Sequence, residues 1–119
     1  MMMNDETSNQ RWRGWWEEPP RCLKQHMSLN LSVGIGITGS GEDYVGPFRI
    51  QGSVNGQVVS FTKRYATHLV QYEGVMVSNK VIRGTWVIST HWCGSFRIWK
   101  EQAISHAESV TSTAEKENA

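Results

Sequence analysis

Long apolar runs are absent from this sequence, and so is an excess of charge of either sign. No stretch approaches the roughly 18 consecutive apolar residues of a membrane-spanning helix, so no transmembrane segment is predicted. The formal net charge is +1, with 12 Lys and Arg against 11 Asp and Glu, and the basic residues are scattered. An electrostatic nucleic-acid footprint is therefore not expected. The polar N-terminus lacks the apolar core of a secretion signal, so a cytoplasmic location is the expectation.

Cysteine is also scarce, and the motifs that carry metal binding or catalysis are missing. The two cysteines, Cys22 and Cys93, form no C-x-x-C pair, and no two histidines are spaced H-x-x-x-H, so a zinc site is not favoured. The sequence has no P-loop and no serine nucleophile elbow. Residues 34–39 match G-x-G-x-x-G in letters, but that motif must open a helix, and here another strand is expected to follow. We expect no cofactor and no metal.

Over residues 11–100, the sequence alternates between apolar and polar residues. Turn signals cut this alternation roughly every 8–12 residues. The clearest stretch is 61–65, where Phe61, Lys63 and Tyr65 share one face. Period-two alternation is typical of strands with one buried and one solvated face. The sequence therefore predicts an all-β domain.

The expected strands are joined by short connections throughout. They cover residues 12–16, 27–33, 35–37, 48–54, 58–65, 69–77, 82–88 and 96–100, with a loop at 39–43. About eight such strands close into a single antiparallel up-and-down barrel, whereas a β-sandwich, the alternative, needs a long crossover. Residues 1–10 are expected to form a disordered arm, 11–100 the barrel domain, and 101–119 a short helical turn and a disordered tail.

The pattern over about residues 11–100 resembles the calycin-like barrels, namely lipocalins, fatty-acid-binding proteins and avidins. The residues that carry the resemblance are Arg13-Gly14-Trp15-Trp16 and the run from Gly84 to Thr90, which looks like the late tryptophan strand of avidins. This resemblance implies a barrel that binds a small ligand, but no site residue is carried over from it. The glycine-rich run from Gly39 to Gly52 is also similar to small uncharacterised bacterial domains, which implies no assigned chemistry.

An up-and-down order places alternate connections at opposite ends of a barrel. The connections at 18–25, 39–46, 66–68 and 90–94 share one end, which we call the first rim. The reactive residue types that fall there are Glu17, Glu18, Cys22, His26, Glu42, Asp43, His68, His91 and Cys93. The first rim is therefore the predicted functional end. Because closure pairs the first strand with the eighth, Cys22 and Cys93 are expected to lie near each other.

Lys63 lies on the aromatic face of its strand, so it is expected to point into the barrel or its mouth. A buried lysine must be paired or have a lowered pKa. The candidate partners are the phenols of Tyr65 and Tyr72 and the carboxylates of Glu17 and Glu73. Lys63 is then either a structural hydrogen-bonded residue or an anchor for an anionic or carbonyl-bearing ligand. The expected ligand-binding residues are Trp16, Lys63, Tyr65, His68, Tyr72, Trp86 and His91.

The leading functional hypothesis is non-catalytic binding of a small, partly apolar or anionic ligand in or at the mouth of the barrel. The alternative is a protein–protein interaction module with a filled core, which would use the tryptophans Trp15, Trp92 and Trp99. An enzyme or metal protein that uses His68, His91 and the rim carboxylates is the least favoured class. A pocket of roughly 300 Å³ or more would support the first hypothesis and a solid interior the second. No nucleic-acid or membrane partner is expected, and the sequence leaves the oligomeric state open.

Overall fold

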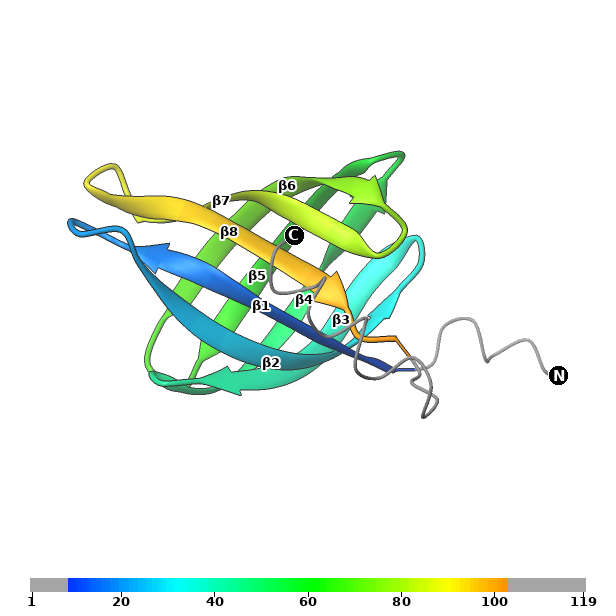
Figure 1. Ribbon diagram of the computed structural model, residues 1–119, viewed down its shortest axis with the longest axis horizontal. Coiled ribbons are helices and arrows are strands. Elements are labelled where there is room, and N and C mark those ends of the chain that lie inside the picture. The colour runs from blue at the N-terminus through cyan, green and yellow to red at the C-terminus, as the bar shows by residue number, and fades with distance from the viewer. Residues whose placement is uncertain (1–8, 103–119) are drawn as a thin grey trace, which may run out of the picture.

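The computed structural model describes residues 9–102, which form one closed antiparallel β-barrel (Figure 1). Its strands are β1 (Gln10–Glu18), β2 (Leu23–Val33), β3 (Gly36–Asp43), β4 (Gly46–Asn55), β5 (Val58–Tyr65), β6 (Leu69–Ser78), β7 (Val81–Ser89) and β8 (Trp92–Lys100). Each strand pairs with its neighbours in the chain, and β1 also pairs with β8. This last pairing closes the sheet, so the barrel prediction is confirmed and the sandwich is excluded.

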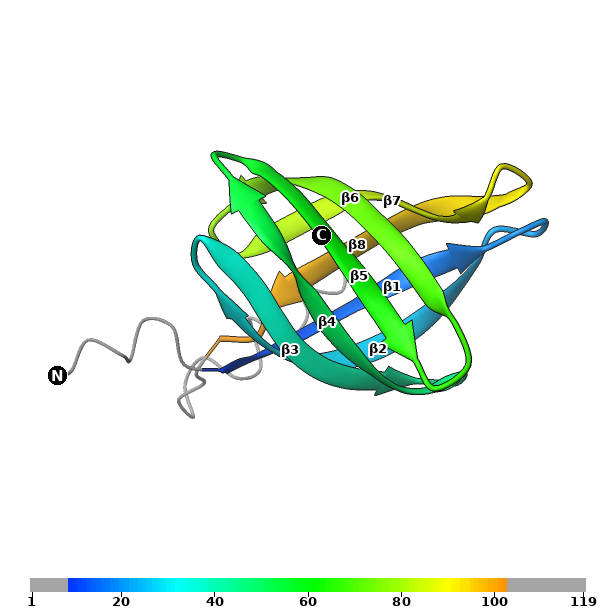
Figure 2. The same cartoon turned by 180° about the vertical axis from the view of Figure 1, so that it is seen from behind.

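Short turns connect the strands alternately at the two ends of the barrel, as Figures 1 and 2 show. The turns after β1, β3, β5 and β7 lie at the first rim, and the other turns lie at the opposite end. The turns β1–β2 and β7–β8 both project at the left of Figure 1. The predicted arm and tail lie largely outside the described residues, although β1 already begins at Gln10.

Strand β3 corrects the sequence prediction, because residues 39–43 are part of a full strand and not a loop. This strand pairs with β2 and β4 along its length. At Gly41, a Cβ atom would collide with the backbone carbonyl of Ser28 and lie 2.8 Å from Cζ of Phe48. Glycine therefore lets a curved strand pass close to its neighbour under the Phe48 ring. As a consequence, the alternation along β3 continues to Asp43 and brings its carboxylate inside the barrel.

The interior of the barrel is filled by the inward-facing side chains that the alternation predicts. The buried apolar residues are Trp12, Trp16, Met27, Leu29, Leu31, Ile37, Phe48, Ile50, Val59, Phe61, Tyr65, Val70, Tyr72, Ile82, Trp86, Phe96 and Ile98. Among the residues that the structure describes, Lys63 is the one charged residue that is buried as a whole. Its inward orientation confirms the expectation from the sequence.

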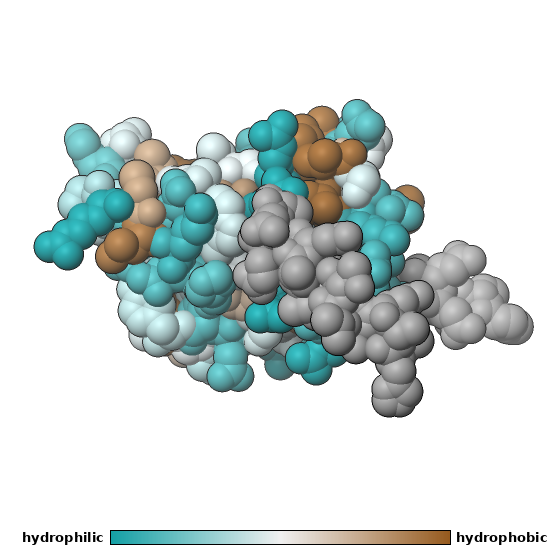
Figure 3. All heavy atoms as spheres, in the orientation of Figure 1, coloured by the Kyte–Doolittle hydropathy of each residue, from teal (hydrophilic) through white to brown (hydrophobic). Residues whose placement is uncertain are grey.

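In Figure 3, the visible apolar side chains gather in a patch at the upper right and a smaller one at the left. Hydrophilic residues separate these patches. Several of the exposed apolar side chains follow β6 and β7, among them Val75, Val77 and Val87. Scattered exposure of this kind is ordinary for a protein surface.

Candidate functional site

A buried polar cluster lies in the barrel below the first rim and is centred on the carboxylate of Asp43. Lys63 Nζ donates to Asp43 Oδ2 at 2.7 Å, and the Tyr65 hydroxyl donates to the same oxygen at 2.6 Å. The indole Nε1 of Trp16 also donates to this oxygen, at 3.1 Å, and the backbone N–H of Val45 donates to Oδ1 at 3.0 Å. Donors on β1, β3–β4 and β5 thus converge on one carboxylate.

Lys63 is enclosed by aromatic rings as well as by polar partners. Its Nζ donates to the Tyr72 hydroxyl at 3.2 Å and lies 3.6 Å from the sulfur of Met27. The ring centroids of Phe48, Tyr65, Tyr72 and Trp16 lie 4.4, 5.0, 5.4 and 5.5 Å from Nζ. These ring contacts add cation–π attraction to the ion pair.

Burial shifts the proton affinities of this cluster in opposite directions. Burial lowers the pKa of Lys63 from 10.5 to about 8, although the neighbouring Asp43 carboxylate acts to raise it. Burial raises the pKa of both Tyr65 and Tyr72, and Asp43 raises it further. Both phenols therefore stay protonated and keep donating or accepting hydrogen bonds at physiological pH. Among the described residues, no buried side-chain nitrogen or oxygen lacks a hydrogen-bond partner, so the cluster forms a fully partnered floor beneath the rim.

Above this floor is a hollow of about 120 Å³ that we call the mouth cavity. Its aromatic lining consists of Trp16, Tyr44, Tyr65, Tyr72, Trp86 and Trp92. The other lining residues are Glu18, Val45, His68, Val70 and Ile88. These residues come from most of the strands and turns that meet at the first rim, so the fold and not one local motif creates the cavity.

The rings of the mouth cavity are held at defined angles. The Trp16 and Trp86 rings are nearly perpendicular, at 85° and with centroids 5.6 Å apart. Tyr44 is stacked with Trp16 at 17° and 6.0 Å, and Trp86 Nε1 donates to the backbone carbonyl of Glu17 at 3.1 Å. The Glu18 carboxylate accepts hydrogen bonds from the Tyr44 hydroxyl at 3.0 Å and from the Gln25 side chain at 2.8 Å.

The structure brings together most of the residues predicted for a ligand site. Trp16, Tyr65, His68, Tyr72 and Trp86 all line the mouth cavity. Lys63 lies beneath the cavity in the floor and is only 1 % exposed. His91 is exposed in the β7–β8 turn and is not among the cavity-lining residues.

The partners of Lys63 are partly different from those expected. Tyr72 bonds Lys63 as predicted, but the carboxylate is Asp43 and not Glu17 or Glu73. Glu17 instead accepts a hydrogen bond from the Ser95 hydroxyl, and Glu73 is exposed. The sequence pattern predicts a loop at Asp43, whereas the alternation of β3 continues to the end of this strand and directs Asp43 inward.

Six lining residues were missing from the predicted site: the aliphatic residues Val45, Val70 and Ile88, together with Glu18, Tyr44 and Trp92. Glu18 and Trp92 lie at strand ends, and Tyr44 lies in a turn. Alternation fixes side-chain direction within a strand but not where a strand meets a turn. The sequence could have pointed to Glu18, Tyr44 and Trp92 only through their position in first-rim connections, at residues 18–25, 39–46 and 90–94.

The first rim holds two thiols but no metal-binding cluster among residues 9–102. Cys22 and Cys93 are both exposed and free. No group of three or more His, Cys, Asp or Glu side chains within this range could hold a metal ion. Cys22 lies in the β1–β2 turn and Cys93 near the start of β8, and their proximity stays a prediction.

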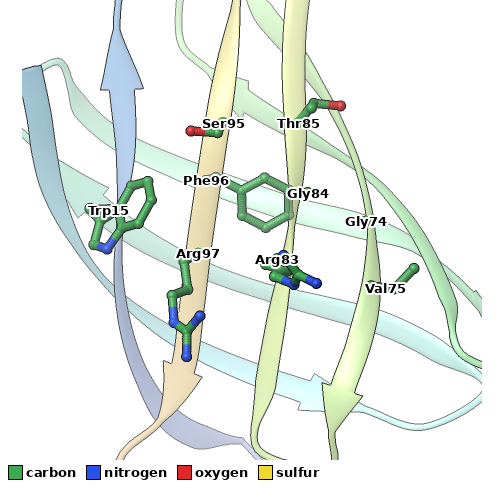
Figure 4. A pocket seen from close by; sticks show the side chains of 9 residues that line it. All are labelled: Trp15, Gly74, Val75, Arg83, Gly84, Thr85, Ser95, Phe96 and Arg97. Atoms are coloured by element: carbon green, nitrogen blue, oxygen red, sulfur yellow. The ribbon is translucent and has the colours of Figure 1, made fainter. Parts of the chain in front are cut away.

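A second hollow of about 390 Å³ lies on the outer wall (Figure 4). Trp15, Arg97, Arg83 and Val75 form a row across β1, β8, β7 and β6, in line with the strand register. Neither arginine has an acidic side chain within 4.0 Å in the part of the chain that the structure describes. This outer groove is open and basic, whereas the mouth cavity is recessed and aromatic.

Comparisons with known proteins assign no family. No protein-family model matches the sequence, and no curated protein is significantly similar to it. Among residues 9–102, no helix is long and apolar enough to cross a membrane.

Proposed function

We propose that this protein is a non-catalytic binding protein whose ligand places one compact, apolar or aromatic group in the mouth cavity. The observation that carries the proposal is a recessed hollow walled by six aromatic side chains over a hydrogen-bonded floor without unpartnered buried polar side-chain atoms among the described residues. Apolar lining with a few fixed polar groups is the usual composition of a small-molecule site. The general resemblance to calycin-like barrels, which bind small ligands at the same kind of position, agrees with this assignment.

The size of the cavity limits what can be bound. An apolar cavity of about 150 Å³ is known to hold benzene, so a hollow of about 120 Å³ accommodates one small ring or a similarly compact group. The cavity does not reach the roughly 300 Å³ set above as support for ligand binding, and the barrel interior is filled, so a ligand enclosed within the barrel is not supported. The mouth cavity therefore binds only one end of the ligand, and the rest of the ligand extends past the first rim.

In this proposal, Lys63 is part of the buried floor and does not contact the ligand directly. Its ammonium group already has Asp43 at 2.7 Å and Tyr72 at 3.2 Å. An anionic ligand would have to displace a carboxylate that three other donors hold in place. A neutral or cationic group fits the cavity better than an anionic one.

The six tryptophans give a direct test by NMR of their indole N–H groups. On titration with phenol or with 3,3-dimethylbutan-1-ol, we expect the signals of Trp16, Trp86 and Trp92 to shift, and those of Trp12 and Trp99 to stay in place. The variant Trp92→Ala should weaken binding by about tenfold or more, whereas Trp99→Ala on the outer wall should not. No shift at the mouth with either compound or with a cationic analogue would contradict the proposal.

A second candidate function is docking of an acidic protein segment in the outer groove. Arg83 and Arg97 are direct cross-strand partners, and like charges in this position are destabilising unless an anion compensates them. Trp15 lies beside Arg97 and offers an apolar contact. A glutamate-rich peptide containing one phenylalanine should bind at low salt, and the double variant Arg83→Glu with Arg97→Glu should abolish that binding. Unchanged binding by the variant would exclude this surface.

A further inference from the structure

The electrostatic character of the mouth cavity distinguishes between neutral and charged ligands. Among the described lining residues, Glu18 contributes a carboxylate, and no lysine or arginine side chain is present. Below the cavity, the charges of Lys63 and Asp43 lie 2.7 Å apart and largely cancel at longer range. The carboxylate of Glu18 therefore dominates, and the cavity favours a positive charge.

The aromatic walls favour the same sign of charge. A cation is attracted to the face of an aromatic ring within about 6 Å of its centroid, and tryptophan is the strongest partner. Trp16 and Trp86 meet edge to face at 85°, with ring centroids 5.6 Å apart, and Tyr44 is stacked on Trp16, so aromatic rings surround the cavity. The floor already uses such contacts, because Trp16, Tyr65 and Tyr72 surround the Lys63 ammonium group.

The hydrogen-bonding state of the cavity determines which cation fits. A bare ammonium group is strongly hydrated and needs acceptors to replace its water. The Glu18 carboxylate is already engaged by Tyr44 and Gln25, and the Tyr65 hydroxyl is engaged by Asp43. A methylated ammonium has little or no N–H to satisfy, and its methyl groups fill apolar space. Aromatic walls with one nearby carboxylate suit such a group.

We propose that the mouth cavity recognises a methylated ammonium group, held by the rings of Trp16 and Trp86 and by the charge of Glu18. This inference rests on the proposed function and specifies its ligand class. The group can be carried by a free small molecule or by a methylated lysine side chain of another protein, and both sources present the same chemistry to the cavity.

The test compares choline with 3,3-dimethylbutan-1-ol, which has nearly the same shape but no charge. Affinities are measured by titration of the Trp16 and Trp86 indole signals. We expect choline to bind at least tenfold more tightly than the alcohol. Glu18→Gln, which keeps a hydrogen-bond acceptor for Tyr44, should weaken choline binding about tenfold and leave the alcohol unaffected. The matched control is Glu42→Gln, because Glu42 is a first-rim residue that does not line the cavity.

The outcomes separate this inference from the proposed function. Equal affinity for the two probes, or an equal effect of Glu18→Gln on both, would overturn the methylated-ammonium inference and leave the binding function standing. Failure of both probes to shift the mouth signals would overturn both. A third probe, N-acetyl-trimethyllysine amide, separates the sources: tighter binding than choline supports a protein side chain, and weaker binding supports a free small molecule.

Discussion

Lys63 and Asp43 face each other inside the barrel, with Nζ 2.7 Å from Oδ2 and with side chains that are 1 % and 0 % exposed. A buried ion pair is costly to form and costly to break, because removal of one partner leaves the other charge unpaired. The pair ties β5 to the end of β3 directly beneath the mouth cavity. Its integrity therefore sets both the stability of this end and the position of the cavity walls.

Removal of one charge should destabilise the barrel strongly. Lys63→Met leaves the Asp43 carboxylate buried without its cation, and we expect a loss of about 3–5 kcal/mol in the free energy of unfolding. The double variant Lys63→Met with Asp43→Asn removes both charges and keeps an acceptor for Tyr65, so it should lose less than Lys63→Met alone. Urea denaturation of the single and double variants measures the coupling. Strictly additive losses would show that the two side chains do not act as a pair.

Stability should depend on pH in a defined way between pH 8 and 10. Burial lowers the pKa of Lys63 from 10.5 in the unfolded chain to about 8 in the folded protein, so over this window the folded state binds fewer protons than the unfolded state. The free energy of unfolding should therefore rise with pH from about 8, by up to about 2 kcal/mol in total.

Above pH 10 the trend should reverse. Tyr65 and Tyr72 have raised pKa values in the folded protein, whereas phenols in the unfolded chain begin to lose their protons near 10. The folded state then binds more protons, and stability falls. Urea titrations at a series of pH values, compared with the doubly neutral variant, isolate the Lys63 contribution. The same rise in that variant would assign the effect to other groups.

The hydroxyls of Tyr65 and Tyr44, at the same rim, should contribute different amounts to the free energy of unfolding. The Tyr65 hydroxyl donates to Asp43 at 2.6 Å in a buried setting, and Tyr44 donates to Glu18 at 3.0 Å at an exposed position. Because hydrogen bonds to buried charged groups contribute about 1.5–3 kcal/mol, Tyr65→Phe should cost roughly that amount. Tyr44→Phe should cost less than about 0.5 kcal/mol. Similar losses for the two variants in thermal or urea denaturation would argue against a central role for Asp43.

Closure of the barrel depends on a close approach between β1 and β8 at Gly14. A Cβ atom at this position would collide with the Arg97 backbone carbonyl and lie 2.5 Å from Cγ2 of Ile98. Gly14→Ala should therefore destabilise the protein by about 2 kcal/mol or more, since backbone must move. Gly36→Ala is the matched control, because its nearest atom, the Gly52 carbonyl oxygen, is 3.5 Å away. Equal melting temperatures of the two variants would contradict a tight fit at the β1–β8 seam.

The sequence predicts the barrel and the inward position of Lys63, because both follow from strict alternation within strands. It does not predict Asp43 as the partner, because the glycines at 39 and 41 interrupt the apolar pattern and make β3 look like a loop. The strong curvature of β3 requires these glycines. The same glycines interrupt the apolar–polar alternation, and this is why the strand is not predicted from the sequence.

The mouth cavity is predictable only in part, for a related reason. Residues within strands, such as Trp16 and Tyr72, are placed correctly by their parity. Tyr44 and Trp92 lie in or beside turns, where parity does not fix the direction of a side chain. His91 shows the opposite error: it lies in a first-rim turn and is exposed, but it does not line the cavity.

The most direct test of the binding account is the location of a bound probe, measured by intermolecular NOEs between the methyl protons of choline and the tryptophan rings. Binding in the mouth cavity should give NOEs to Trp16, Trp86 and Trp92, which line it, and none to Trp15 and Trp99 on the outer wall. NOEs to Trp15 or Trp99 without any to Trp16 and Trp86 would contradict it and would move the binding site to the outside of the barrel.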